Sequence, residues 1–171
     1  MRLRYFIVDA FTSEPFGGNP AGVVLLDGDF PSERLMQQVA AELRYSETAF
    51  VQQQSCYEFT VRYFTPCSEV DLCGHATIAS FGVLWQHGLI SENSPIVNHT
   101  LAGDLMVRID RQVMMQMAAP SVLDTRVDAT RLHRIMAGNS RWNGPTYPLR
   151  LFPLVCPISL CPSRIWIRST P

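Results

Sequence analysis

Hydrophobic and polar residues form short alternating runs over the first 120 positions, interrupted by two longer helical patterns. Residues 57–64 alternate between apolar and polar side chains, as a half-buried strand does. Residues 74–87 are instead apolar on nearly every side, and a helix without a polar face must be surrounded by protein. We therefore expect a buried central helix here, which Gly88 ends as a C-terminal stop.

A second helix is predicted on the surface. Ser32 can cap its first turn, because its hydroxyl can accept a hydrogen bond from an unpaired backbone N–H. Apolar residues then recur every three or four positions, which places them on one face. These residues are Leu35, Met36, Val39, Ala40 and Leu43.

The remaining pattern predicts strands joined by turns. The glycine- and proline-rich stretch 13–20 is expected to be a loop, and residues 102–104 a three-residue hairpin loop. A strand-rich chain with one surface helix and one buried helix has an α+β layout. Further strands are predicted at residues 3–11, 21–26, 45–52, 96–101, 105–110 and 113–118.

Size and composition narrow the class of protein. A chain of 171 residues has room for one ordinary domain or two small ones. The net charge of −1, without a basic stripe before residue 140, argues against nucleic-acid binding. No stretch approaches the ~18 apolar residues of a membrane span, and the N-terminus lacks a secretory signal pattern. Five cysteines without a framework spacing favour a reducing compartment, so we expect a cytoplasmic protein.

The entrance to the buried helix is where we expect chemistry. Cys73, Gly74 and His75 occupy its first turn, where unpaired backbone N–H groups and the positive end of the helix dipole attract an anion. Gly74 has no Cβ, so a ligand can approach the backbone closely. His75 and the two N–H groups of Gly74 and His75 would hold a carboxylate or a carbonyl oxygen of a substrate.

Cys73 has two interpretations. The pKa of a thiol falls at a helix N-terminus, and a thiolate there could exchange protons with carbon as an alternative acid or base. The plain alternative is a small, buried, hydrophobic residue. A metal site is not expected, because no second Cys/His pair completes a site with Cys67, Cys73 and His75.

Three motifs resemble the PhzF-like isomerases of phenazine biosynthesis. They are Asn19-Pro-Ala-Gly-Val, Ser46-Glu-Thr-Ala-Phe and Asp71-Leu-Cys-Gly-His-Ala-Thr, in the order and spacing of that family. The resemblance covers roughly residues 3–120. It implies a diaminopimelate-epimerase-like half-barrel, in which mainly antiparallel strands wrap around a central buried helix.

The resemblance also implies a function. PhzF-like proteins are cofactor-independent isomerases, which would move a proton between carbons of a small carboxylated metabolite without a metal. Glu47 matches the family's catalytic glutamate, and His75 is the second catalytic residue that the likeness implies. Gly74, Asn19 and Asp71 would lie along the substrate-binding cleft, with Asp71 mainly fixing its loop.

The chain changes in character near residue 140. Residues 141–171 contain four of the 14 arginines, no acidic residue and six of the 12 prolines. We divide the chain into a PhzF-like N-terminal domain (1–120), a linker or the start of a truncated second domain (121–140), and an atypical tail (141–171). The tail is either a flexible, proline-rich extension or the product of a frame shift near residue 138. Its frequent Trp, Ile, Leu and Phe favour the shift.

Two functional alternatives stay open beside the isomerase. In PhzF-like proteins the site lies between two similar domains, and the second domain supplies an aspartate and a glycine-rich anion loop. Neither feature is recognisable after residue 120. The chain could therefore be a non-catalytic single domain that self-associates as a homodimer through its exposed cleft face. A cysteine-based epimerase or racemase is the other alternative.

Overall fold

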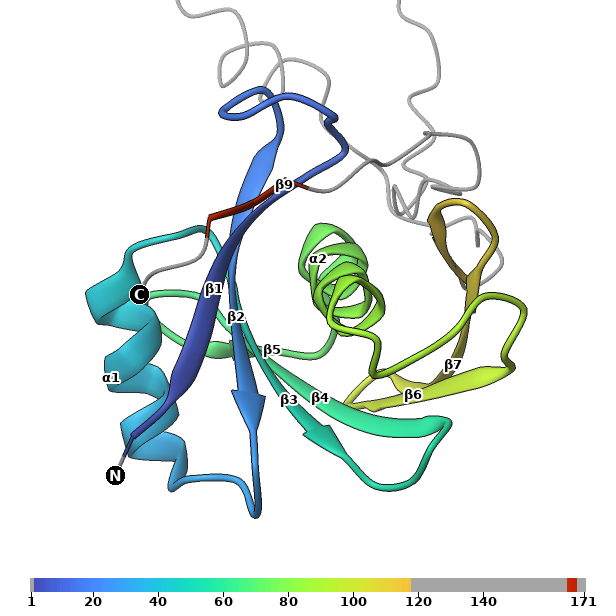
Figure 1. Cartoon of the computed structure of the whole chain (residues 1–171). Helices are drawn as coiled ribbons and strands as arrows, with labels where there is room; N and C mark the ends of the chain where they lie inside the picture. Colours follow the sequence, from blue (N-terminus) through green and yellow to red (C-terminus); the bar gives the residue numbers. More distant parts are fainter. Residues whose placement is uncertain (1, 118–165, 169–171) are drawn as a thin grey trace, which may run out of the picture. The chain divides into compact units, whose positions relative to one another are not determined.

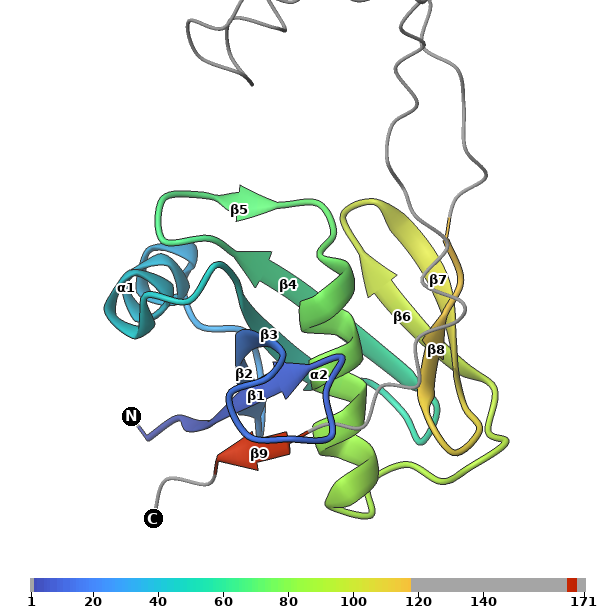
Figure 2. The ribbon, with the colours of Figure 1, turned by 90° about the horizontal axis from the view of Figure 1, so that it is seen from above.

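A curved sheet encloses one helix and carries a second helix on its outer face (Figure 1). The structure is a computed structural model that describes residues 2–117 and 166–168. Helix α2 (Gly74–Gln86) lies on the concave side of the sheet, and helix α1 (Glu33–Leu43) packs on the convex side, as Figures 1 and 2 both show. Neither helix in this part of the chain is long and apolar enough to cross a membrane.

The sheet is mixed, but most of its strand pairs are antiparallel. Its order is β8-β7-β6-β4-β3-β2-β1-β9, and β5 pairs with β4 beside this path. Only β2–β3 and β4–β6 are parallel among the pairs of the described residues. This confirms the predicted α+β half-barrel. The strands are β1 (Arg4–Ala10), β2 (Asn19–Leu26), β3 (Thr48–Gln53), β4 (Glu58–Phe64), β5 (Glu69–Val70), β6 (Ile96–Thr100), β7 (Gly103–Ile109), β8 (Val113–Met115) and β9 (Trp166–Arg168).

Helix α2 is buried over most of its length, as its apolar composition predicts. Every residue from Ala76 to Leu84 is buried. The two hydroxyl side chains in this run bond back into the helix: Thr77 Oγ1 donates to the Cys73 carbonyl at 2.7 Å, and Ser80 Oγ donates to the Ala76 carbonyl at 2.7 Å. The interior of the half-barrel therefore accommodates these hydroxyls without leaving them unpaired.

Helix α1 confirms the second helical prediction. The Ser32 hydroxyl accepts a hydrogen bond from the Leu35 N–H at 3.3 Å, which caps the first turn. Met36 and Ala40 are buried, and they form a second core on the convex face of the sheet with Val24, Phe50 and Phe64. Because the central strands have a core on each side, their position is fixed from both faces.

Some strand boundaries differ from the sequence prediction. Strand β2 begins at Asn19 rather than at residue 21, because Asn19 and Pro20 pair with Ala10 and Asp9 of β1. Strand β3 begins at Thr48 rather than at residue 45. The hairpin between β6 and β7 has two residues rather than three, since Gly103 already pairs with Thr100. The two-residue strand β5 was not predicted; it follows a tight turn that local sequence patterns do not resolve.

Strand β9 lies within the stretch that the sequence assigns to an atypical tail. Its backbone pairs antiparallel with β1 at one end of the described sheet, with Val8 opposite Ile167. Otherwise, residues 121–140 and 141–171 lie outside the described residues, as does the frame shift predicted near residue 138. Those predictions stay predictions.

A chain of buried hydrogen bonds connects α2 to two strands. The Asn98 side chain of β6 donates from Nδ2 to the Tyr63 hydroxyl of β4 at 3.1 Å. The Tyr63 hydroxyl lies 2.6 Å from Thr77 Oγ1 in the second turn of α2. Asn98, Tyr63 and Thr77 are all fully buried. These bonds fix the position of the first part of α2 relative to β4 and β6 inside the half-barrel.

Replacing Tyr63 with Phe should destabilise the fold by about 1–3 kcal/mol, because the buried Asn98 amide loses its partner. Urea unfolding followed by circular dichroism measures this change. Tyr57→Phe is the matched control, since Tyr57 is half-exposed. Equal stability of the Tyr63→Phe variant and the parent chain would show that the hydrogen-bonded chain contributes nothing to the folded state.

Candidate active site

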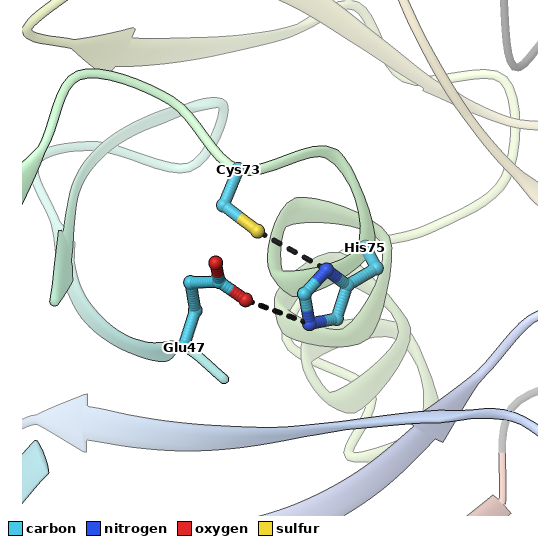
Figure 3. A group of neighbouring side chains, drawn as sticks. All are labelled: Glu47, Cys73 and His75. Atoms are coloured by element: carbon cyan, nitrogen blue, oxygen red, sulfur yellow. Dashed lines mark hydrogen bonds and ion pairs between the residues drawn. The ribbon is translucent and has the colours of Figure 1, made fainter. Parts of the chain in front are cut away.

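Glu47, Cys73 and His75 meet at the first turn of α2 (Figure 3). Each side chain contributes one atom that could bind a metal or carry a proton: a carboxylate oxygen, the thiol sulfur and a ring nitrogen. These three atoms lie within 4.8 Å of one another. Cys73 is the N-cap of α2, and His75 is the second residue of the helix. Glu47 comes from another part of the chain, directly before β3. The structure thus brings together residues that the sequence separates by more than 25 positions.

The pairing of β2 with β3 positions Glu47. The Gly22 N–H donates to the Glu47 carbonyl at 3.1 Å, at the point where the parallel pairing of the two strands begins. A Cβ at Gly22 would lie 2.8 Å from Thr48 Oγ1, so a larger residue would push the strands apart at this point. The backbone of Glu47 is therefore held in place, while 22% of its side chain stays exposed.

His75 lies at the centre of the cluster. Its Nδ1 is 3.2 Å from Cys73 Sγ, and its Nε2 is 3.3 Å from both Glu47 Oε2 and Ser46 Oγ. Burial lowers the pKa of His75, although the charge of Glu47 and the carbonyl of Pro20 partly oppose this effect. The net direction is downward, so the ring is neutral at neutral pH.

Glu47 has the features of a proton acceptor. Its Oε2 atom is buried and makes no hydrogen bond within the described residues. The distance to His75 Nε2 is within the range of an ion pair, but the orientation does not satisfy a hydrogen bond. The carboxylate therefore keeps a lone pair free for a proton at Oε2, an atom that is itself buried, while 22% of the side chain as a whole is exposed.

The predicted fall in the pKa of Cys73 is wrong. Burial, with a smaller contribution from the negative charge of Glu47, raises the pKa of this thiol to about 12. The N–H groups of Ala76 and His75 act in the opposite direction, as expected for a helix N-terminus, but their effect is smaller. Cys73 is a neutral thiol at neutral pH, which disfavours it as a catalytic base.

The two other predicted binding residues lie at the margin. Asn19 is exposed at the start of β2, the strand whose Pro20 carbonyl approaches His75. Asp71 is exposed two residues before the N-cap, and its carbonyl accepts a hydrogen bond from the Ala102 N–H at 3.3 Å. The structure thus shows Asp71 fixing its loop through the backbone. Gly74, in contrast, is partly buried beside His75 at the start of the helix.

Sequence reasoning missed two neighbours of the histidine, Ser46 and Pro20. Both lie inside the motifs that carry the family resemblance, directly beside residues that were singled out. Their contacts with His75 depend on how β2, β3 and α2 come together, so no local pattern indicates them. The Ser46 hydroxyl oxygen and the Pro20 carbonyl oxygen both lie beside the ring, so they add to the hydrogen-bond acceptors around it.

Glu47, Cys73 and His75 also have the donor atoms that a zinc site uses. From the sequence alone, a different set was weighed for a metal site, namely Cys67, Cys73 and His75. Cys67 is exposed and stands outside this cluster. The Cys73 thiol and His75 Nδ1 are hydrogen-bonded to each other, and a metal would have to replace that bond. The metal would also have to displace the thiol proton, which is harder to remove because the pKa of Cys73 is raised. This arrangement favours proton chemistry over metal binding.

Two cavities lie away from the cluster. One of about 430 Å³ is lined by methionines of β7 and β8, including Met106 and Met115. The other, of about 610 Å³, lies near the opposite end of α2, beside Leu84 and Leu89. Neither includes Glu47, Cys73 or His75, so the candidate active site rests on its side-chain chemistry.

Comparison with known sequences assigns the chain to a family. The sequence model of PhzC-PhzF, described as "Phenazine biosynthesis-like protein", matches residues 8–151. The chain belongs to the PhzC-PhzF family. The match continues beyond residue 120, where the resemblance was expected to end, and into the first part of the predicted tail.

Two curated relatives illustrate the extent of the similarity. "Phenazine biosynthesis-like domain-containing protein" of Homo sapiens is 46% identical over 117 residues, which cover 63% of this chain and 39% of the relative. "Uncharacterized isomerase YddE" of Salmonella typhimurium is 40% identical over 144 residues, which cover 81% of this chain and 48% of the relative. This PhzC-PhzF chain thus matches less than half of the length of either relative.

Solved structures share the fold. A PhzF family protein from Bacillus anthracis matches with a TM-score of 0.66 and 35% identity, over 78% of this chain and 47% of the other. A "Predicted Epimerase" from Pseudomonas aeruginosa matches with a TM-score of 0.56 and 22% identity, over 70% and 46%. The second likeness concerns the fold alone. Together they confirm the predicted epimerase-like half-barrel.

His75 should titrate below the usual histidine value near 6.5, because the folded protein disfavours its charged form. Between its folded pKa and 6.5 the unfolded chain binds more protons, so stability should fall as the pH drops through this window. Nuclear magnetic resonance of the ring measures the pKa directly. The free energy of unfolding should fall less between pH 7.5 and pH 5.5 in the His75→Gln variant than in the parent chain. Titration of His75 at or above 6.5 would contradict the assignment.

Proposed function

We propose that this PhzC-PhzF chain carries the proton-transferring site of a cofactor-independent isomerase or epimerase. The family match, and relatives that are named isomerases, support this class of reaction. The observation that carries the proposal is the Glu47 carboxylate, which is partly exposed, has an oxygen without a hydrogen bond, and lies 3.3 Å from a neutral histidine.

Glu47 would act as both base and acid. Its carboxylate takes a proton from a substrate carbon, and the resulting carboxylic acid returns that proton to another carbon or to the other face of the same carbon. The atoms balance within the substrate, so the reaction needs neither a metal nor a redox cofactor. The fold holds the backbone of Glu47 through its hydrogen bond with β2, so a movement of the carboxylate between two positions would have to come from side-chain rotation.

The first turn of α2 would stabilise the negative charge that develops on the substrate. The helix dipole places positive potential there, and the His75 ring can donate a hydrogen bond without carrying a charge. These groups fit a substrate with a carboxylate or carbonyl oxygen next to the reacting carbon. A small carboxylated metabolite is therefore the substrate class that we propose, and Gly74, Asn19 and Asp71 remain its proposed binding residues.

Replacing Glu47 with Gln should abolish proton transfer, because the amide keeps the shape but cannot accept the proton. We expect a loss of about 10²–10⁴-fold in rate, the usual contribution of a general acid–base group. The measurement is deuterium incorporation from D₂O into a panel of small chiral or unsaturated carboxylic acids, followed by mass spectrometry.

The matched control is Glu42→Gln, since Glu42 is exposed on α1. This variant should exchange deuterium at the rate of the parent chain. If the parent chain incorporates deuterium into one of the acids and Glu47→Gln does so equally fast, Glu47 is not the acid–base group. If instead only a Cys73→Ser variant loses exchange, the cysteine-based epimerase becomes the better proposal.

We also propose that the chain forms a homodimer, as the sequence suggests. Exposed apolar side chains near the β6–β7 hairpin support self-association, among them Leu101 and Met106. The mass in solution tests this, because a single chain has a mass of 19.3 kDa. A homodimer without exchange activity would favour the non-catalytic alternative.

A further inference from the structure

The geometry points to a role for Cys73 other than proton transfer to substrate. We propose that Cys73 is a positioning residue: its thiol donates a hydrogen bond to Nδ1 of His75 and so keeps the ring proton on Nε2, the nitrogen that faces Glu47. The effect of this arrangement on activity rests on the proposed function. The position of the ring proton does not, and it can be measured by itself.

The two ring nitrogens of His75 have different surroundings. Nδ1 lies 3.2 Å from Cys73 Sγ. Nε2 lies 3.3 Å from Glu47 Oε2, as Figure 3 shows by a dashed line. It also lies 3.3 Å from Ser46 Oγ. The neutral ring carries one proton, so one nitrogen must donate and the other must accept. Which nitrogen donates depends on which neighbour can supply a proton.

The hydrogen bonds around the sulfur favour the thiol as the donor to Nδ1. The backbone N–H groups of Ala76 and His75 lie against Sγ and use it as an acceptor. A thiol has a single proton to donate, and burial keeps that proton on the sulfur at neutral pH. The thiol proton therefore has two possible acceptors, His75 Nδ1 at 3.2 Å and the Glu47 carboxylate.

The Glu47 carboxylate is a competing acceptor for this proton, since it also interacts with the thiol. If the thiol donated to Glu47, then Nδ1 would have to carry the ring proton and donate it to the sulfur. Nε2 could then accept a hydrogen bond from the Ser46 hydroxyl, but its unprotonated face would still lie 3.3 Å from the Glu47 carboxylate. Two electron-rich groups at this distance repel each other in a partly buried site. Placing the proton on Nε2 removes that repulsion.

The backbone that carries the thiol is itself fixed. The Cys73 carbonyl accepts hydrogen bonds from the Thr77 N–H at 3.0 Å and from Thr77 Oγ1 at 2.7 Å. Thr77 in turn contacts Tyr63, which Asn98 holds from β6. The sulfur is therefore presented to His75 from a buried frame, as a residue that orients another residue requires.

This arrangement gives His75 a defined role. A neutral ring with its proton on Nε2 places its donor on the side of the ring that faces Glu47, where a substrate oxygen could accept it, at every pH above its lowered pKa. The opposite tautomer would present an acceptor there, which could not stabilise negative charge on a substrate oxygen. Cys73 thus supports charge stabilisation without touching the reacting atoms.

Nuclear magnetic resonance on the full chain, labelled with ¹⁵N-histidine, tests the proposal at pH 7.5. Two-bond ¹H–¹⁵N spectra distinguish a protonated from an unprotonated ring nitrogen. In the parent chain we expect His75 to show a protonated Nε2 and an unprotonated Nδ1. In Cys73→Ala the two ¹⁵N shifts should move toward each other, because the donor to Nδ1 is lost. In Cys73→Ser the hydroxyl can donate, so the shifts should return toward those of the parent chain.

Cys67→Ala is the matched control, because Cys67 is an exposed cysteine outside the cluster. It should leave the His75 signals unchanged. A protonated Nδ1 in the parent chain overturns the proposal, and so do unchanged His75 shifts in a folded Cys73→Ala variant. If Cys73→Ala does not fold, the parent spectrum and the Cys73→Ser variant still decide.

The same variants separate this proposal from the proposed function. If the tautomer responds to Cys73 as expected but the parent chain exchanges no deuterium, the isomerase proposal fails and the positioning role stands. If Glu47→Gln loses exchange while the His75 tautomer ignores Cys73, the isomerase proposal stands and the positioning role fails. In an active parent chain, Cys73→Ser should retain more exchange activity than Cys73→Ala.

Discussion

The enclosure of α2 is the constraint on which the rest of the structure depends. A helix with nine consecutive buried residues, Ala76–Leu84, cannot lie on a surface, so the sheet must curve around it. Within such an interior, unpaired polar groups are costly. The first turn of the helix is the exception, because its backbone N–H groups have no partners inside the helix. Polar chemistry therefore concentrates at that end.

Rigidity and access are combined at Glu47. Strand β3 begins with four buried residues, from Thr48 to Val51, and has a core on each face. Glu47 directly precedes this run, so its backbone is fixed by the sheet while its side chain is partly exposed. Such an arrangement suits a group that must be held accurately and must still meet a substrate. His75 on α2 completes it from the opposite side.

The sequence predicts those features that depend on local composition. The apolar run of α2 and the Ser32 cap of α1 each carry their own signal, so both helices could be located. The motifs that resemble the family could also indicate Glu47, Gly74 and His75 as neighbours. The start of β2 could not be predicted, because Pro20 normally favours a loop and only pairing with β1 makes it part of a strand.

Electrostatics were harder to predict than structure. A helix N-terminus lowers the pKa of a thiol, and that rule alone suggested a reactive Cys73. The outcome depends on how deeply the thiol is buried and on the nearby Glu47 charge, and both follow from tertiary contacts. The contact between Ser46 and His75 is of the same kind, since it joins two segments 29 residues apart.

The two parallel strand pairs also have a bearing on the order of folding. Strands β2 and β3 are connected through α1 on the outer face, whereas β4 and β6 are connected through α2 on the inner face. A parallel pair forms only after its connecting segment has crossed the sheet, and such distant pairings slow folding. Because the segment between β4 and β6 contains the enclosed helix α2, we expect this pair to close only once that helix has formed against the sheet. The cluster at the tip of that helix should then assemble in the same cooperative step as the closure of the sheet, rather than as an independent local unit.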